Sequence, residues 1–92
     1  QAATRKLKDQ GLLARLAVEE DGFSVRLAAV ERLEDQEALA RVVLREKDAY
    51  IRKVATLKLT DGELLRRIAA RDADANVRSA AEARRKELAA ER

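Results

Sequence analysis

Three arginines that follow a valine or an isoleucine are the side chains of this sequence best suited to ionic chemistry. Each has an acidic residue six positions upstream, and the pairs are Glu20 with Arg26, Glu46 with Arg52, and Asp72 with Arg78. The planar fork of a guanidinium group binds a carboxylate or a phosphate through two parallel hydrogen bonds. The pattern therefore predicts either an internal ladder of ion pairs or a row of cations that binds an external anion such as a phosphate or a carboxylate. We favour the internal ladder, because each arginine has its acid at the same distance.

Two further basic sets recur along the chain. One comprises Arg15, Arg41 and Arg67, and the other comprises Lys6, Arg32, Lys58 and Arg84. Each member of the second set is followed three positions later by an acid, so we interpret that set as structural or solvated charge near helix ends. The first set is less compensated, and Arg45, Arg66 and Arg71 extend it. It is the best candidate in the sequence for contact with a polyanion.

The residue types that most catalytic and metal sites require are missing. The chain has no His, Cys or Trp, so the commonest general bases, nucleophiles and soft metal ligands are absent. Asp72 and Asp74 have the chemistry to hold a hard cation, but two acids in a turn between helices more often cap a helix. The three glycines are isolated and form no phosphate-binding loop. We therefore expect no enzymatic activity, no cofactor and no metal.

The composition favours a single helical domain. Hydrophobic residues make up 47% of the 92 residues but aromatic residues only 2%, so Ala, Leu and Val must fill the core. The absence of Pro and the presence of only three Gly favour helices. Charged residues reach 40%, and no apolar run is long enough for a membrane span. The lack of Cys is compatible with a reducing cytoplasm, where we expect the protein.

A short phrase occurs three times at intervals of 26 residues. Val25-Arg26, Ile51-Arg52 and Val77-Arg78 occupy equivalent positions in the sequence. This period divides the single domain 1–92 into three full units, 9–34, 35–60 and 61–86. A partial unit, 1–8, precedes them and a C-terminal tail, 87–92, follows. The partial unit predicts that the chain is a piece of a longer protein.

Each unit is expected to form two short helices with apolar residues at helical spacing. In the first helices these residues are Leu13, Leu16, Ala17, Leu39, Val42, Val43, Leu65, Ile68 and Ala69. In the second helices they are Val25, Ala28, Ala29, Leu33, Ile51, Val54, Ala55, Leu59, Val77, Ala80 and Ala81. Aspartates 9, 35, 48, 61 and 74 precede five of the six helices as caps, and Gly22 takes that place in the remaining one.

Such short helices are marginal alone, and stacking buries their apolar faces. The predicted fold is therefore all-α: an alpha-alpha superhelix, or solenoid, of antiparallel helix pairs. The Val-Arg-x-x-Ala phrase, with its acid six residues before the arginine, resembles the HEAT repeats and is most similar to short bacterial HEAT-like repeats. The 26-residue period is shorter than the usual HEAT unit, and the proline often found in the first helix is absent. Variant leucine-rich repeats are the alternative family. The resemblance implies that the second helices line the concave surface, and it leaves the task of the protein open.

The outward positions of the second helices do not repeat. They are Ser24, Leu27, Glu31, Tyr50, Lys53, Leu57, Asn76, Ser79 and Ala83. Positions without a stacking role either vary for a partner or drift, and an isolated exposed Leu is ordinary. Leu27, Tyr50 and Leu57 offer a small apolar and aromatic anchor. The candidate partner-binding residues are Leu27, Glu31, Tyr50, Lys53, Leu57 and Ser79.

The sequence thus predicts a non-catalytic scaffold that presents an extended surface to a protein or peptide. The main alternative is a nucleic-acid-binding module that uses Arg15, Arg41 and Arg67 on the first-helix face. It is weakened by the scarcity of aromatic residues, since single-strand binders usually stack bases on several of them. A third interpretation is a structural or regulatory segment of a larger enzyme. The polar residues Glu82 and Arg85, at positions that are mostly apolar in the other units, predict that the last helix is a terminal cap.

Overall fold

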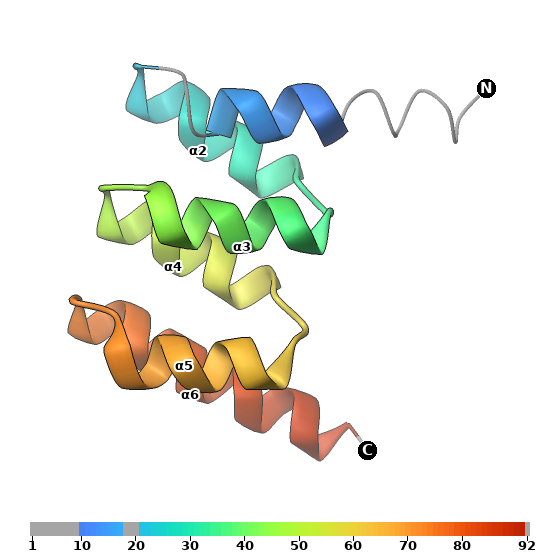
Figure 1. Ribbon diagram of the computed structural model, residues 1–92, viewed down its shortest axis with the longest axis vertical. Coiled ribbons are helices and arrows are strands. Elements are labelled where there is room, and N and C mark those ends of the chain that lie inside the picture. Colours follow the sequence, from blue (N-terminus) through green and yellow to red (C-terminus); the bar gives the residue numbers. More distant parts are fainter. Residues whose placement is uncertain (1–9, 18–20, 92) are drawn as a thin grey trace.

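The computed structural model describes residues 10–17 and 21–91, and all regular secondary structure in these ranges is α-helical (Figure 1). A helix at residues 10–17 is followed by α2 (Phe23–Arg32), α3 (Gln36–Arg45), α4 (Ala49–Lys58), α5 (Gly62–Arg71) and α6 (Ala75–Ala90). The predicted all-α class is confirmed for this part of the chain. None of these helices combines the length and the apolar character that crossing a bilayer requires.

The helices lie in two layers. In Figure 1 the helix at residues 10–17, α3 and α5 lie one below the other in the nearer layer, and α2, α4 and α6 lie behind them. Across the layers α3 packs against α4, and α5 packs against α6. Within the rear layer α4 contacts both α2 and α6. The second helices of successive pairs therefore form a continuous row.

Aspartates start four of the helices. Asp35, Asp48, Asp61 and Asp74 each accept hydrogen bonds from two backbone N–H groups of the first turn. Helix α2 begins after Gly22, which has no side chain to offer. These predicted caps are confirmed, and residue 9 lies outside the described residues. Each cap stabilises its helix by about 1 kcal/mol, which matters for helices this short.

The core lies between the two layers and follows most of the predicted apolar positions. Leu39, Ile51 and Leu65 are fully enclosed. Val25 and Ala28 were predicted to be buried, but both are exposed. The physical reason is their place in the stack: α4 and α6 each have a preceding second helix beside them, whereas α2 has none among the described residues.

Helix α6 is longer than α2, α3, α4 and α5, which have 10 residues each. It runs for 16 residues, so residues 87–90 of the predicted tail continue the helix instead of leaving it. Leu88 in this extension packs against the core. Glu82 and Arg85, the polar residues predicted to mark a terminal helix, form a salt bridge of 2.7 Å with each other. Their charges therefore neutralise each other on the surface of α6.

Candidate functional site

Arginines of the second helices join successive helix pairs through carboxylates. Arg26 Nε lies 3.0 Å from Glu46 Oε2. Arg52 contacts Asp72 with two nitrogens, Nε to Oδ2 and Nη2 to Oδ1, both at 3.1 Å. The four side chains are at most 19% exposed. We call these two pairs the inter-unit ladder, because each pair joins one of the units predicted from the sequence to the next.

The ladder corrects the predicted pairing. Each arginine was expected to pair with the acid six residues upstream. Instead, Arg52 Nη1 donates to the backbone carbonyl of Glu46 at 3.0 Å, and Arg78 Nη1 donates to that of Asp72 at 2.6 Å. The upstream residue thus supplies its carbonyl, while its carboxylate receives the arginine of the preceding unit. The corresponding contact of Glu20 lies outside the described residues.

The turn after each acid explains why its carboxylate is placed for the neighbouring unit. Glu46 Oε1 accepts a hydrogen bond from the N–H of Asp48, and Asp72 Oδ1 accepts one from the N–H of Asp74. Burial by itself would raise the pKa of Asp72. Hydrogen bonds from Arg52 and from the Asp74 N–H, with the charges of Arg52 and Arg78, outweigh burial and lower the pKa of Asp72 below its ordinary value.

Two members of the second basic set contact the preceding second helix. Lys58 Nζ donates to the carbonyls of Val30 and Glu31 at the end of α2. Arg84 Nε donates to the carbonyl of Leu59, just after α4, at 2.9 Å. Carbonyls at a helix end lack partners within the helix and attract cations. Burial lowers the pKa of Lys58, although the nearby acids oppose this effect. The structural interpretation is confirmed for these two residues, and Lys6 lies outside the described residues.

Two glutamines that were not predicted from the sequence form hydrogen bonds with the backbone of the turns between units. Gln10 Oε1 accepts a hydrogen bond from the N–H of Glu34 at 2.7 Å. Gln36 Oε1 accepts one from the N–H of Thr60 at 2.9 Å, and its Nε2 donates to the carbonyl of Lys58 at 3.1 Å. The available signal was the identical residue type at equivalent positions in two units. A polar residue at the start of a helix gives no indication of a contact more than twenty residues away.

The predicted partner-binding residues lie mostly on exposed surface, but they do not all behave alike. On α4, Tyr50 is 53% exposed and Leu57 is 42% exposed, with the half-buried Lys53 between them. Glu31 on α2 and Ser79 on α6 are exposed. Leu27 was predicted to point outward, but it is partly buried and packs against the core. Its place at the flank of α2 brings a long apolar side chain within reach of the core, so it belongs to the scaffold.

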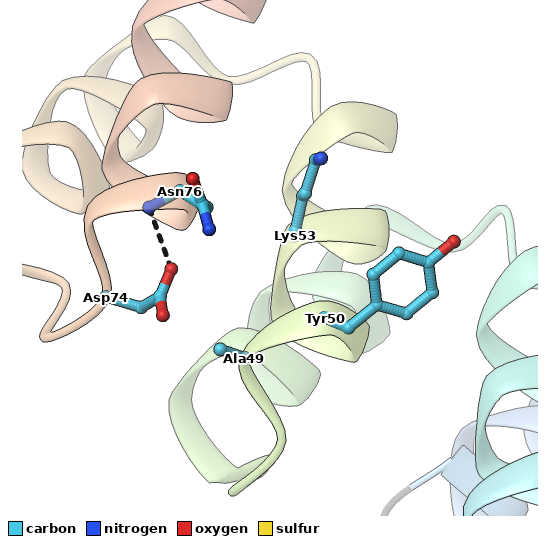
Figure 2. A pocket seen from close by; sticks show the side chains of 5 residues that line it. All are labelled: Ala49, Tyr50, Lys53, Asp74 and Asn76. Carbon is cyan, nitrogen blue, oxygen red and sulfur yellow. Dashed lines mark hydrogen bonds between the residues drawn. The ribbon is translucent and has the colours of Figure 1, made fainter.

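A small open hollow of about 130 Å³ lies beside this surface, between the first turns of α4 and α6. It is lined by Ala49, Tyr50, Lys53, Asp74 and Asn76 (Figure 2). Asp74 is occupied as the cap of α6 and accepts the Asn76 N–H at 2.8 Å. Lys53 makes no ion pair with another described residue. In Figure 2 the Tyr50 ring extends away from Asp74 and Asn76. The hollow thus offers a cation and an amide beside an aromatic ring.

The layer formed by the helix at residues 10–17, α3 and α5, which we call the first-helix layer, presents the arginine surface predicted to contact a polyanion. Arg15, Arg41 and Arg67 are exposed, and no ion pair joins them to another residue within 10–17 and 21–91. Arg66, by contrast, pairs with Glu63 at 3.0 Å. Leu44 on α3, which the sequence pattern did not single out, is 79% exposed. It directly follows two buried valines, so its apolar character alone gave no sign of exposure.

The acids weighed as cation ligands have other partners. Asp72 belongs to the inter-unit ladder and Asp74 caps α6. Across the described ranges no three His, Cys, Asp or Glu side chains gather in a way that suits a metal ion. Comparison of the chain with models of protein families, with curated proteins and with solved structures gives no match. The surfaces described above therefore carry the assignment of function.

Proposed function

We propose that this chain is a non-catalytic scaffold that binds a protein or peptide through the outer face of its second helices. The observation that carries the proposal is the exposure of Tyr50 and Leu57 on one face of α4, on either side of Lys53. Tyrosine is enriched among residues that dominate interface energetics, and an apolar neighbour excludes water from its contacts. The adjacent hollow can take one side chain of the partner.

The side-chain contacts between helix pairs support a solenoid of 26-residue repeats, similar to short bacterial HEAT-like repeats. Three kinds of contact between helix pairs recur at equivalent positions. They are made by an arginine at 26 and 52, a glutamine at 10 and 36, and a basic residue at 58 and 84. These side chains make contacts between helix pairs and leave the exposed side chains of Tyr50 and Leu57 on α4 free. A preorganised surface of this kind loses little conformational entropy on binding.

Recognition without bond chemistry is the mechanism that fits these residues. The largely buried carboxylates of Glu46 and Asp72 already bind arginines in the inter-unit ladder. The sequence contains no His or Cys to act as a base or nucleophile. We therefore assign neither a reaction nor a cofactor to the chain, and we place it in a reducing compartment such as the cytoplasm.

Selection from a displayed library of random peptides tests the proposal. Peptides enriched on the wild-type protein are synthesised, and their Kd values are measured by calorimetry. We expect Tyr50→Ala to weaken binding by about tenfold or more, which corresponds to about 1.4 kcal/mol. Leu57→Ala should have a smaller effect in the same direction. Leu44→Ser is the matched control, because it removes an even more exposed leucine from the opposite layer.

Two results would contradict the proposal. One is a library that yields no enriched peptide, and the other is a set of peptides that bind Tyr50→Ala as tightly as the wild type. The first result would leave the α4 face without a peptide ligand and would favour a structural or regulatory segment of a larger enzyme. The second would place peptide binding on another face of the chain. Thermal melting of each variant shows that the fold is intact before binding is compared.

A further inference from the structure

The outer surface of α3 and α5 carries a regular group of cations. Arg41 and Arg45 lie one turn apart on α3, and Arg67 and Arg71 occupy the equivalent positions on α5. All four are exposed, and residues four apart on a helix lie on the same face. In Figure 1 α3 and α5 lie one below the other in the same layer. We call these four arginines the basic face.

The inter-unit ladder removes the acids that would otherwise neutralise the basic face. Glu46 follows Arg45 directly in the sequence, and Asp72 follows Arg71. Both carboxylates are largely buried, where they bind arginines of the preceding units. They are therefore not available to the cations of the basic face.

The remaining acids of α3 and α5 do not pair with the basic face either. Glu63 binds Arg66, and Glu37, one turn before Arg41, makes no ion pair within the described ranges. The helix dipole accounts for a cation in the last turn of each helix, namely Arg45 and Arg71. It does not account for Arg41 or Arg67, which lie one turn earlier.

We propose that the basic face binds the phosphate backbone of double-stranded nucleic acid. Regularly placed cations suit a polyanion whose charges also recur regularly, and arginine forks bind phosphate oxygens in pairs. Neither aromatic residue lies on α3 or α5, so base stacking plays no part and binding is independent of base sequence. This surface belongs to the first-helix layer, so it is separate from the peptide-binding face of α4.

Leu44 separates this proposal from the nearest alternative. It lies between Arg41 and Arg45 in the sequence and is highly exposed. An acidic protein segment would use an apolar contact there as well as the arginines, whereas a phosphate backbone uses the charges alone. Leu44→Ser should therefore leave duplex binding unchanged and weaken binding of an acidic amphipathic peptide.

Fluorescence anisotropy with a labelled mixed-sequence DNA duplex tests the proposal at several salt concentrations. If four phosphates are neutralised, log K should fall with log salt at a slope of about −3.6, which is roughly a 100-fold loss between about 50 and 200 mM salt. Arg41→Gln/Arg67→Gln should reduce that slope by about two units. Arg32→Gln/Lys86→Gln removes the same charge from exposed positions on the second helices, and it should leave the slope nearly unchanged.

Three outcomes would overturn the proposal. The first is the absence of duplex binding at the lowest salt concentration. The second is an equal loss of affinity in the two double variants, which would indicate attraction by net charge alone. The third is tighter binding of an acidic amphipathic peptide than of the duplex, with a loss in Leu44→Ser, which would assign the face to a protein. None of these outcomes bears on peptide binding at Tyr50, so the two proposals fail independently.

Discussion

Asp72 accepts hydrogen bonds from both sides of the junction between two helix pairs. Arg52 reaches it from α4, and the N–H of Asp74 reaches it from the turn before α6. The same arginine also donates to the carbonyls of Glu46 and Lys47. Because one guanidinium group satisfies a carboxylate and two carbonyls in a largely buried place, its removal leaves several acceptors without a partner.

Arg52→Ala should lower the free energy of unfolding by about 2–3 kcal/mol, because a partly buried pair is broken on one side only. Arg66→Ala removes a salt bridge to Glu63 on exposed surface and should cost less than about 1 kcal/mol. Urea denaturation followed by circular dichroism measures both values. Equal midpoints for the two variants would refute the stabilising role of the inter-unit ladder.

The lowered pKa of Asp72 predicts a dependence of stability on pH. A carboxyl group with a lower pKa in the folded state stabilises the fold above its unfolded pKa of about 3.9, and this stabilisation is lost as the pH falls through the folded value. The wild type should therefore be more stable than Asp72→Asn at neutral pH, with the difference shrinking below about pH 4. A difference that stays constant from pH 7 to about pH 2 would contradict this assignment.

At the scale of the elements, the turns between units depend on side chains from the start of the preceding first helix. Gln36, at the start of α3, holds the turn that leads from α4 to α5. The equivalent residue of the third unit is Gly62, and there α6 continues as a helix without a turn. The glutamine is thus present where a turn has to be held, and it is absent where the helix runs on.

Gln36→Ala should destabilise the protein by about 1–2 kcal/mol, because the Thr60 N–H and the Lys58 carbonyl lose their side-chain partner. Gly62→Ala should instead stabilise it by about 0.4–1 kcal/mol, since an added Cβ meets open space and the backbone is not left-handed. Melting temperatures give the two signs. Hydrogen exchange at the Thr60 amide should accelerate only in the Gln36 variant, and unchanged exchange would contradict the proposed contact.

At the scale of the whole molecule, the neighbours of a helix within its layer decide how well its apolar side chains are covered. Val25 and Val77 occupy equivalent places in the second helices of the first and third units. Val25 is 44% exposed, whereas Val77 is fully buried. The two residues have the same side chain on the same kind of helix, so the difference comes from the neighbouring helices.

Val77→Ala should cost about 2–3 kcal/mol, because burial of its two methyl groups is lost and a cavity is left. Val25→Ala should cost less than about 1 kcal/mol, because its side chain is already in contact with water. The identical substitution in the two units makes each variant the control for the other. Chemical denaturation measures both, and similar losses would show that α2 is as well covered as α6.

Much of the local structure followed from the sequence by itself. The helices, their aspartate caps and most of the buried positions depend on side chains within about one turn of each other, and a repeating sequence displays that order directly. The exposed state of Tyr50 and Leu57 on α4 was likewise predicted from helical spacing. Only tertiary packing decided the rest. Arg52 meets Asp72 twenty residues away, Val25 has no preceding second helix beside it among the described residues, and Leu27 reaches the core. The arginines of the basic face make no ion pair among the described residues partly for the same reason. Glu46 and Asp72, the acids next to Arg45 and Arg71 in the sequence, pair with arginines of another unit, and spacing along the chain does not specify which units become neighbours.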